Sequence, residues 1–263
     1  MNQLLIGFGL GLPVGALAFL PRRLRRWRAG RQRRIPTVSL QAFDPMFREE
    51  TFGPTPAAEV LFLGDGEGLL GSMSDRETWI IAGLAKRART IFEFGTCSGK
   101  TTYLLARNAP AEARVITLTL GPDQMSRYHA APGDTPEAEA TALKESHFTR
   151  FTYSGSPVEA KIEQRFGDSK AFDAESLAGK VDLILVDGSH AYSYVKSDSE
   201  KALRMVAPGG VILWHAYRAP SGETRDVFRY LNELSATSKL VGLARTSLVA
   251  YRAPGREAPS STS

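Results

Sequence analysis

Short apolar runs alternate with longer amphipathic stretches from residue 74 to residue 252, and this alternation predicts the architecture of most of the chain. Apolar runs of the buried-strand kind predict strands at 90–94, 114–120, 161–166, 181–186 and 211–214. Stretches with helical periodicity predict helices at 74–86, 100–107, 192–206 and 224–234. Strands that alternate with helices favour an α/β domain with a mostly parallel sheet, covered on both faces. Two further runs, 240–243 and 247–251, predict an antiparallel edge to that sheet.

The segments around these elements lack such periodicity. Residues 37–73 combine many Pro and Gly residues with short apolar patches, so we expect an irregular arm that lies on a domain spanning 74–252. The polar segment 121–150 predicts a loop with one helix near its acidic residues at 137–139. Residues 253–263 are rich in Pro and Ser and predict a disordered tail.

The N-terminus carries a long apolar run. Residues 4–20 are uncharged over 17 positions, and as an α-helix they reach ~25 Å, near the lower limit for crossing the hydrocarbon core. We therefore expect residues 1–21 to form one transmembrane helix, with an interfacial or buried helix as the alternative. Arginines follow this run and none precedes it, so the positive-inside rule places the N-terminus outside and the domain in the cytoplasm.

Three glycines recur at every fourth position of this apolar run: Gly7, Gly11 and Gly15. On a helix they form a groove of the GxxxG kind, which lets a second helix approach closely in lipid. This pattern predicts a transmembrane-helix partner, although glycine is also common in membrane helices for other reasons. Pro13 interrupts the middle of the stripe.

The charge of the chain is concentrated beside the apolar run. Residues 1–36 contain eight Arg and no acidic residue, so 22–36 is expected to be a basic juxtamembrane segment. The remaining residues carry 25 basic and 28 acidic side chains, a net charge of −3. A mildly acidic domain has no general attraction to phosphate backbones, so nucleic acid is not an expected partner. The single cysteine, Cys97, excludes an internal disulfide and a CxxC zinc site.

A glycine-containing turn follows the first predicted strand of the domain. Its sequence is IFEFGTCSGKTT, residues 91–102, in which Gly95 and Gly99 flank a tight turn that leads into a helix. A phosphate loop is the competing interpretation, because Gly99-Lys100-Thr101 ends like GxxxxGK[ST]. Only three residues separate the two glycines where that loop needs four, which argues against an NTPase.

Three polar residues follow two predicted strands. Asp187 ends the run 181–186, His190 lies three residues later, and His215 follows the strand at 211–214. The carboxyl ends of parallel strands form the edge at which open α/β folds bind ligands, so we expect these side chains to meet there as candidate catalytic residues. A structural role for either histidine alone is the alternative, and it is favoured for His190.

Four segments together resemble one family. They are IFEFGTCSGKTT, FGDSKAFD, VDLILVDGSHAYSYVKSDSEKAL and PGGVILWHAY, in this order and spacing. They resemble the class I S-adenosylmethionine-dependent methyltransferases of the small-molecule O-methyltransferase type, which implies a Rossmann-like sheet. The resemblance implies that the methionine end of the cofactor is held by Glu93, Gly95, Thr96, Cys97, Ser98 and Gly99. It likewise implies that Asp168 and Ser169 meet the adenine, and that Asp187 lies beside the sulfonium, as a metal ligand in the divalent-metal-dependent members.

Two positions depart from the family pattern. Thr119 stands where the family has an acidic residue that holds both ribose hydroxyls, so we expect S-adenosylmethionine to bind weakly. Ala216 replaces the aspartate of the WHDY pattern found in close relatives. A metal site formed by Asp187, His215 and position 216 would therefore lack one oxygen ligand, and we do not expect a divalent metal.

Two functions remain open at this point. The first is a membrane-anchored methyltransferase that acts on a hydroxyl of a small or lipid-like molecule, with His215 or His190 as the base. The second is a non-catalytic methyltransferase-fold subunit that stabilises a larger membrane complex, of respiratory or photosynthetic type, through the helix that carries Gly7, Gly11 and Gly15. Thr119 and Ala216 favour the second function, and the retained motifs favour the first.

Overall fold

The computed structural model describes residues 33–63, 71 and 73–255. The chain divides into two units, Met1–Arg33 and Arg34–Ser263, and almost all described residues belong to the second. The apolar run at 4–20, with Gly7, Gly11 and Gly15, lies outside the described residues. Among the residues that are described, no helix has the length and apolar character needed to cross a membrane.

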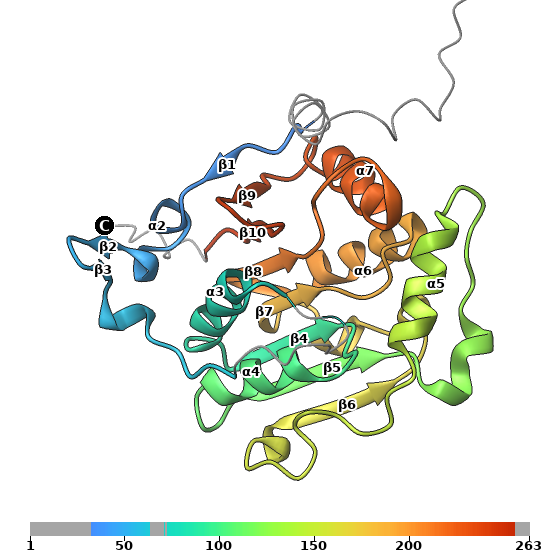
Figure 1. Ribbon diagram of the computed structural model, residues 1–263, viewed down its shortest axis with the longest axis horizontal. Coiled ribbons are helices and arrows are strands. Elements are labelled where there is room, and N and C mark those ends of the chain that lie inside the picture. The colour runs from blue at the N-terminus through green and yellow to red at the C-terminus, as the bar shows by residue number, and fades with distance from the viewer. Residues whose placement is uncertain (1–32, 64–70, 72, 256–263) are drawn as a thin grey trace, which may run out of the picture. The chain divides into compact units, whose positions relative to one another are not determined.

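The second unit is built around one eight-stranded sheet (Figure 1), in the order β1-β9-β10-β8-β7-β4-β5-β6. All its neighbouring pairs are parallel except the two that β10 makes, with β8 and with β9. The sheet is therefore mostly parallel and Rossmann-like, with its antiparallel pairing toward one edge, as the sequence predicts. The strands are β1 (Thr37–Val38), β4 (Thr90–Phe94), β5 (Arg114–Thr119), β6 (Ile162–Phe166), β7 (Val181–Val186), β8 (Val206–Trp214), β9 (Val241–Leu243) and β10 (Val249–Arg252).

Helices cover both faces of this sheet because successive residues of each strand point to opposite sides. Ile91 of β4 belongs to a core that includes Ile81 and Leu105, whereas Phe92 belongs to a second core with Val195 and Leu231. The first core lies under α3 and α4 and the second under α6 and α7 (Figure 1). These helices are α3 (Asp75–Ala85), α4 (Lys100–Asn108), α6 (Tyr192–Met205) and α7 (Arg225–Leu234).

Helix α3 begins with the predicted capping box. The Ser74 hydroxyl accepts a hydrogen bond from the Glu77 main-chain N–H, and the Glu77 carboxylate accepts one from the Ser74 N–H. The other carboxylate oxygen of Glu77 accepts two bonds of 2.7 Å from the main-chain N–H and the hydroxyl of Ser247. Glu77 thus joins the start of α3 to the connection between β9 and β10.

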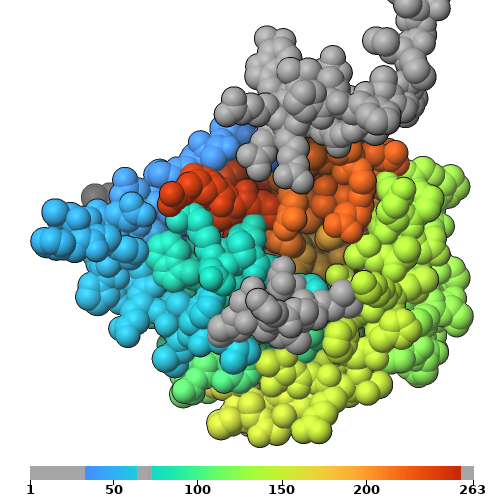
Figure 2. All heavy atoms as spheres, in the orientation of Figure 1, coloured from blue at the N-terminus to red at the C-terminus, as the bar shows by residue number. Residues whose placement is uncertain are grey.

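The segment expected to be irregular contains short elements: α2 (Leu40–Phe43), β2 (Glu49–Glu50) and β3 (Gly53–Pro54). It lies beside α3 (Figure 2), where the ring of Phe47 meets that of Trp79 edge-on at a centroid distance of 5.0 Å. Leu40 and Met46 of this segment are buried in the first core, and β1 adds a strand to the sheet beyond β9. The segment is therefore part of the packed unit.

The helix in the polar segment is α5 (Pro136–Glu145), which places its last turn over the carboxyl ends of the strands. Strand β8 starts earlier than predicted, at Val206, and runs through Pro208-Gly209-Gly210 with a register shift against β7. Gly210 permits this course, because a Cβ there would lie 3.0 Å from the carbonyl oxygens of Val181 and Asp182.

Candidate active site

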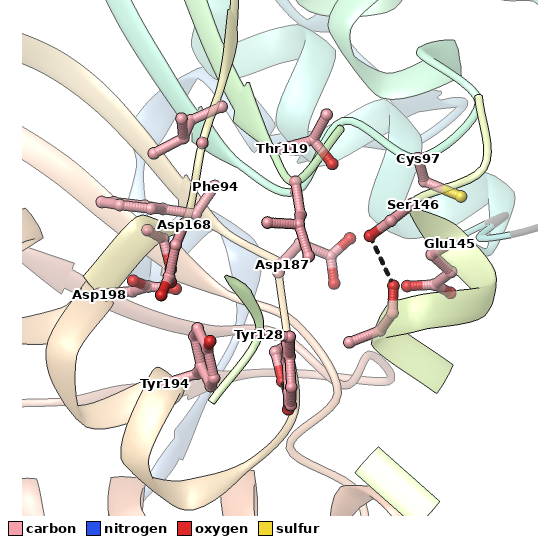
Figure 3. A pocket seen from close by; sticks show the side chains of 18 residues that line it. Phe94, Cys97, Thr119, Tyr128, Glu145, Ser146, Asp168, Asp187, Tyr194 and Asp198 are labelled. Carbon is pink, nitrogen blue, oxygen red and sulfur yellow. Dashed lines mark hydrogen bonds between the residues drawn. The ribbon is translucent and has the colours of Figure 1, made fainter. Parts of the chain in front are cut away.

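A pocket of about 560 Å³, including its open mouth, lies at the carboxyl ends of β4, β5, β6 and β7. Figure 3 shows Asp168 and Asp198 on one side of Asp187, and Cys97 and Glu145 on the other. Parallel strands end together at this edge, so residues distant in the sequence converge there. Six residues expected from the sequence line the pocket: Gly95, Cys97, Thr119, Asp168, Ser169 and Asp187.

Four other residues expected to hold the cofactor do not line this pocket: Glu93, Thr96, Ser98 and Gly99. Glu93 is 1% exposed and accepts hydrogen bonds from the hydroxyls of Thr102, at 2.5 Å, and Thr117, at 2.6 Å. Burial raises the pKa of Glu93 to about 8, although these two bonds act in the opposite direction. Glu93 is therefore a neutral acid at pH 7 that joins β4 to α4 and β5.

The turn after β4 depends on glycine for packing. Gly95 has φ +95°, and a Cβ there would lie 2.2 Å from the carbonyl oxygen of Asp187. Gly99 has φ +77°, and a Cβ there would meet the side chains of Phe151 and Tyr153. Cys97 also has positive φ, +46°, which is unfavourable for a residue with a side chain. Burial raises the pKa of its thiol to about 12, so the thiol is protonated at neutral pH.

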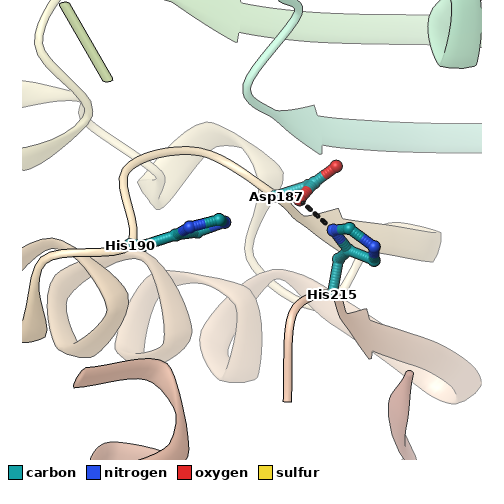
Figure 4. Close-up of side chains that lie close together, drawn as sticks. All are labelled: Asp187, His190 and His215. Carbon is teal, nitrogen blue, oxygen red and sulfur yellow. Dashed lines mark hydrogen bonds and ion pairs between the residues drawn. The ribbon is translucent and has the colours of Figure 1, made fainter. Parts of the chain in front are cut away.

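The two histidines lie beside Asp187 (Figure 4) but outside the residues that line the pocket. Nδ1 of His215 is 2.8 Å from Oδ1 of Asp187, and its Nε2 is 3.8 Å from Oε2 of Glu77. Burial disfavours the charged ring, but Asp187 and Glu77 outweigh this effect and raise the pKa of His215 to about 10. His215 thus carries a proton at neutral pH and cannot act as the base in this state. Burial lowers the pKa of His190.

The structure adds residues to the pocket that the sequence analysis did not single out. Glu145, at the end of α5, lines the pocket together with Asp187. Burial raises the pKa of Glu145 to about 7, and the charge of Asp187 adds to this rise. At the other end Asp198 is 1% exposed, and burial raises its pKa to about 7. Glu145 lies at the end of α5 and Asp198 lies within α6. The pattern of apolar residues predicts where such helices occur, but no sequence signal indicated that these two carboxyl groups face a pocket.

The charge of the pocket restricts what it can hold. Four carboxyl groups line it, those of Glu145, Asp168, Asp187 and Asp198, and no Lys, Arg or His occurs among its described lining residues. The rings of Tyr128 and Tyr194 stack at a centroid distance of 4.5 Å beside them. A ligand with positive charge and a flat ring suits such a pocket, since carboxylates attract the first and aromatic faces the second.

Comparison with known families agrees with this geometry. Residues 92–217 match the family described as "Methyltransferase domain", a segment that runs from β4 through β8 and includes Asp187, His190 and His215. No curated protein matches the chain.

The solved structures that match this chain have low sequence identity to it. The O-methyltransferase TomG from Streptomyces achromogenes, solved in complex with SAM, is 19% identical, with 69% of this chain and 82% of that chain covered at a TM-score of 0.48. A putative O-methyltransferase from Klebsiella pneumoniae is 19% identical, with 74% and 92% covered and a TM-score of 0.49. An O-methyltransferase from Bacillus cereus in complex with SAH is 18% identical, with 71% and 85% covered and a TM-score of 0.46.

The sheet alone would permit many activities, since the same fold serves unrelated functions. The family match restricts the possible activities further than the fold does, because it covers the strand ends and the motifs that form the pocket. Residues 92–217 of this chain, somewhat less than half of its length, therefore match the methyltransferase domain family over the part that forms the pocket.

Proposed function

We propose that this chain is an S-adenosylmethionine-dependent methyltransferase that methylates a hydroxyl group of a small or lipid-like molecule. The acidic pocket carries the proposal, because it lies within the family segment and because its charge suits a cation. S-adenosylmethionine has a sulfonium and an ammonium group, together with a flat adenine ring, so the lining residues fit it. When bound, it supplies an electrophilic methyl group.

The residues at the strand ends would hold this cofactor along the pocket. Asp168 and Ser169 would contact the adenine end of the cofactor. Thr119 would contact its ribose, and Asp187 would lie beside its sulfonium. The Asp168 carboxylate is fixed by accepting a bond of 2.9 Å from the main-chain N–H of Lys170. Thr119 offers a neutral hydroxyl to the ribose, so this part of the site binds less strongly than a carboxylate would.

Methylation of a hydroxyl requires that its proton leaves. Glu145 lines the pocket on the side of Cys97, and its pKa of about 7 allows it to accept a proton near neutral pH. His215 is already protonated there, so it does not serve as the acceptor. We therefore assign proton removal to Glu145.

The N-terminal run at 4–20 supports membrane attachment as part of this proposal, with the N-terminus outside and the domain in the cytoplasm. Gly7, Gly11 and Gly15 would contact a helix of a partner protein. Removal of the C-terminal domain by protease added to intact cells would contradict this orientation.

Cofactor binding tests the proposal directly. We expect calorimetric titration of the purified full chain with S-adenosylmethionine to show one weak site. Thr119→Asp should tighten binding ~10- to 100-fold, equivalent to ~1.4–2.8 kcal/mol, because a carboxylate can accept bonds from both ribose hydroxyls. Thr237→Asp is the matched control, since Thr237 is exposed and lies away from the pocket. Equal effects of both substitutions would contradict the assigned role of Thr119.

Methyl transfer separates the enzyme from the non-catalytic subunit. With labelled S-adenosylmethionine and a membrane lipid extract, we expect label in the lipid fraction, and at least ~100-fold less with Glu145→Gln. Binding of S-adenosylmethionine should survive that substitution. The non-catalytic alternative, which Thr119 and Ala216 favour, predicts no label. It also predicts that Gly7→Leu, Gly11→Leu and Gly15→Leu together release the chain from a complex that Asp187→Ala leaves intact.

A further inference from the structure

A second cleft lies at the carboxyl ends of β5 and β6, next to the acidic pocket. It measures about 1160 Å³, including its open mouth, and it shares Leu118, Gly167 and Asp168 with that pocket. It meets the pocket at Asp168, on the opposite side of Asp187 from Glu145 (Figure 3), so the proposed methyl transfer does not use it. Its other lining residues include Arg127, His129, Arg165, Phe166, Phe172 and Asp173.

The guanidinium of Arg165 is held in a fixed position at this cleft. Its Nε donates a hydrogen bond of 2.6 Å to Oε1 of Glu163, and its central carbon lies 5.5 Å from the ring centroid of Phe172. The other carboxylate oxygen of Glu163 is bound by Arg114. The two terminal nitrogens of Arg165 make no hydrogen bond to any described residue. A guanidinium that is already ordered loses little conformational freedom when it binds an anion.

The loop after β5 presents two more basic side chains. The main chain of His129 is held on both sides, since its N–H donates a bond of 3.0 Å to the Tyr194 hydroxyl and its carbonyl accepts one of 2.6 Å from Nζ of Lys170. Within the part of the chain that the structure describes, neither the His129 ring nor the Arg127 guanidinium has an ion-pair or hydrogen-bond partner. Both groups are therefore available to a ligand.

The carboxylates of the cleft already accept hydrogen bonds from the main chain. Oδ1 of Asp168 accepts a bond of 2.9 Å from the Lys170 N–H, and Oδ1 of Asp173 accepts one of 2.9 Å from the Glu175 N–H. The two aspartates offset the two arginines in formal charge, so the cleft does not attract cations as the acidic pocket does. The available guanidinium and imidazole donors instead favour a ligand that accepts hydrogen bonds.

Two aromatic rings border these donors. Phe166 is 48% exposed, and it is one of four large apolar side chains that are exposed among the described residues. The ring of Phe172 lies 5.2 Å from that of Phe92, which belongs to the second core, so its position is set by the fold. Aromatic faces beside ordered cations suit a ligand that carries both negative charge and a flat or apolar body.

We propose that this second cleft binds an organic phosphate, in which the phosphate group is attached to a flat or apolar body. Arg127 and Arg165 would hold the phosphate, because a guanidinium donates two parallel bonds to phosphate oxygens. Phe166 and Phe172 would pack against the body of the ligand. A soluble organic phosphate and the headgroup of an anionic lipid share this chemistry, and the apolar run at 4–20 would bring the second source close.

Binding of a model phosphate to the full chain tests this proposal without S-adenosylmethionine, so it can fail while the proposed methyltransferase function stands, and the reverse. The chain, purified in a neutral detergent, is titrated by calorimetry with phenyl phosphate, inorganic phosphate and benzyl alcohol. We expect phenyl phosphate to bind at one site, at least ~10-fold more tightly than inorganic phosphate or benzyl alcohol, because only phenyl phosphate contacts both the arginines and the rings.

Variants locate the binding site. Arg127→Gln and Arg165→Gln should each weaken phenyl phosphate binding ~10- to 100-fold, the usual effect of losing a hydrogen bond to a charged group. Arg127 is exposed and supports no other described residue, so its variant should fold even if that of Arg165 does not. Phe166→Ala should weaken binding of phenyl phosphate and leave that of inorganic phosphate unchanged. Arg107→Gln is the matched control, because Arg107 is exposed in the last turn of α4 and lines neither cavity.

Bilayer discs distinguish the two sources of phosphate. Phe166→Trp places a fluorescent ring at the cleft of the full chain. Brominated phosphatidic acid should quench it more than brominated phosphatidylcholine if a lipid headgroup is the ligand, and equally if the ligand is soluble. Absence of saturable phenyl phosphate binding, unchanged affinity in the Arg127 variant, or an equal loss in the Arg107 control would each overturn the proposal.

Discussion

Glu93 is a buried carboxyl group that serves the fold. Its two hydroxyl donors come from α4 and β5, and no basic side chain occurs among its hydrogen-bond partners in the described part of the chain. A charged carboxylate in such surroundings is unfavourable, so the group keeps its proton. Residues on either side of it, Phe92 and Phe94, pack in the core on the opposite face of the sheet. Strand alternation thus turns Glu93 toward α4.

Stability should depend on pH through Glu93. The raised pKa, about 8 in the fold against 4.5 for the free group, means that protonation favours the folded chain. This contribution is complete below about pH 4.5 and is lost as the pH rises through about 8. Glu93→Gln cannot ionise, so the stability of the natural chain relative to this variant should fall by at least ~2 kcal/mol between pH 5 and pH 9. Urea unfolding of both proteins between pH 5 and pH 9 measures the difference in their free energies of unfolding. A difference that does not change with pH would show that the pKa of Glu93 is the same in the folded and unfolded chain.

At the scale of elements, one buried carboxylate, that of Asp44, links the segment 33–63 to residues beside α3 and in β10. Asp44 is 4% exposed and accepts a bond of 3.0 Å from the Met46 N–H. Its two oxygens also meet Arg87, which follows α3, at 3.2 Å, and Arg252 of β10, at 2.9 Å. Asp44 therefore connects three elements that are distant in the sequence.

Asp44→Asn should lower the free energy of unfolding by ~1–3 kcal/mol, because both arginines lose a charged partner and the remaining amide cannot replace it. Glu50→Gln is the control in the same segment. Its ion pair with Arg48 is exposed, with side chains 59% and 70% accessible, and should contribute less than ~0.5 kcal/mol. Similar losses for the two substitutions in chemical denaturation would contradict the role given to Asp44.

Strands and helices that are marked by a pattern of neighbouring residues could be predicted from the sequence. The strand ends at Phe94, Val186 and Trp214 followed from apolar runs, and parallel pairing then placed Asp187 and His215 at one edge. Contacts made by packing could not be predicted in this way. Glu77 reaches His215 because α3 packs beside β8 and β10, and Glu145 reaches the pocket because of where α5 lies. The sequence predicts that these helices form, but it does not predict which residues their polar side chains contact in the folded chain.

At the scale of the whole molecule, the folded unit extends beyond the elements that the sequence marks most clearly. The Arg34 N–H donates a bond of 2.9 Å to the side chain of Asn232, and Ile35 is 4% exposed. At the other end, Ala253 is 9% exposed and the carbonyl of Pro254 accepts a bond from the Gly209 N–H. Both ends of the described chain are thus attached to the domain.

A fragment of residues 34–255 should accordingly be more stable than one of residues 37–252. The shorter fragment loses the buried side chain of Ile35 and the contacts of Pro254, an expected cost of ~2–4 kcal/mol. At roughly 2–4 °C per kcal/mol, this lowers the melting temperature by ~4–16 °C. Calorimetry on the two fragments measures the difference. Equal melting temperatures would mean that the terminal residues add nothing to the fold.

The close approach of Gly95 to Asp187 has an evolutionary consequence. Any side chain at position 95 would collide with the Asp187 backbone, so a descendant that had lost its activity would still need this glycine to fold. Selection for folding alone preserves the turn, and its presence in a genome sequence does not distinguish working enzymes from pseudoenzymes. Thr119 and Ala216 are the positions that can carry such a trace, because Thr119 lines the pocket and Ala216 directly follows His215 after the end of β8.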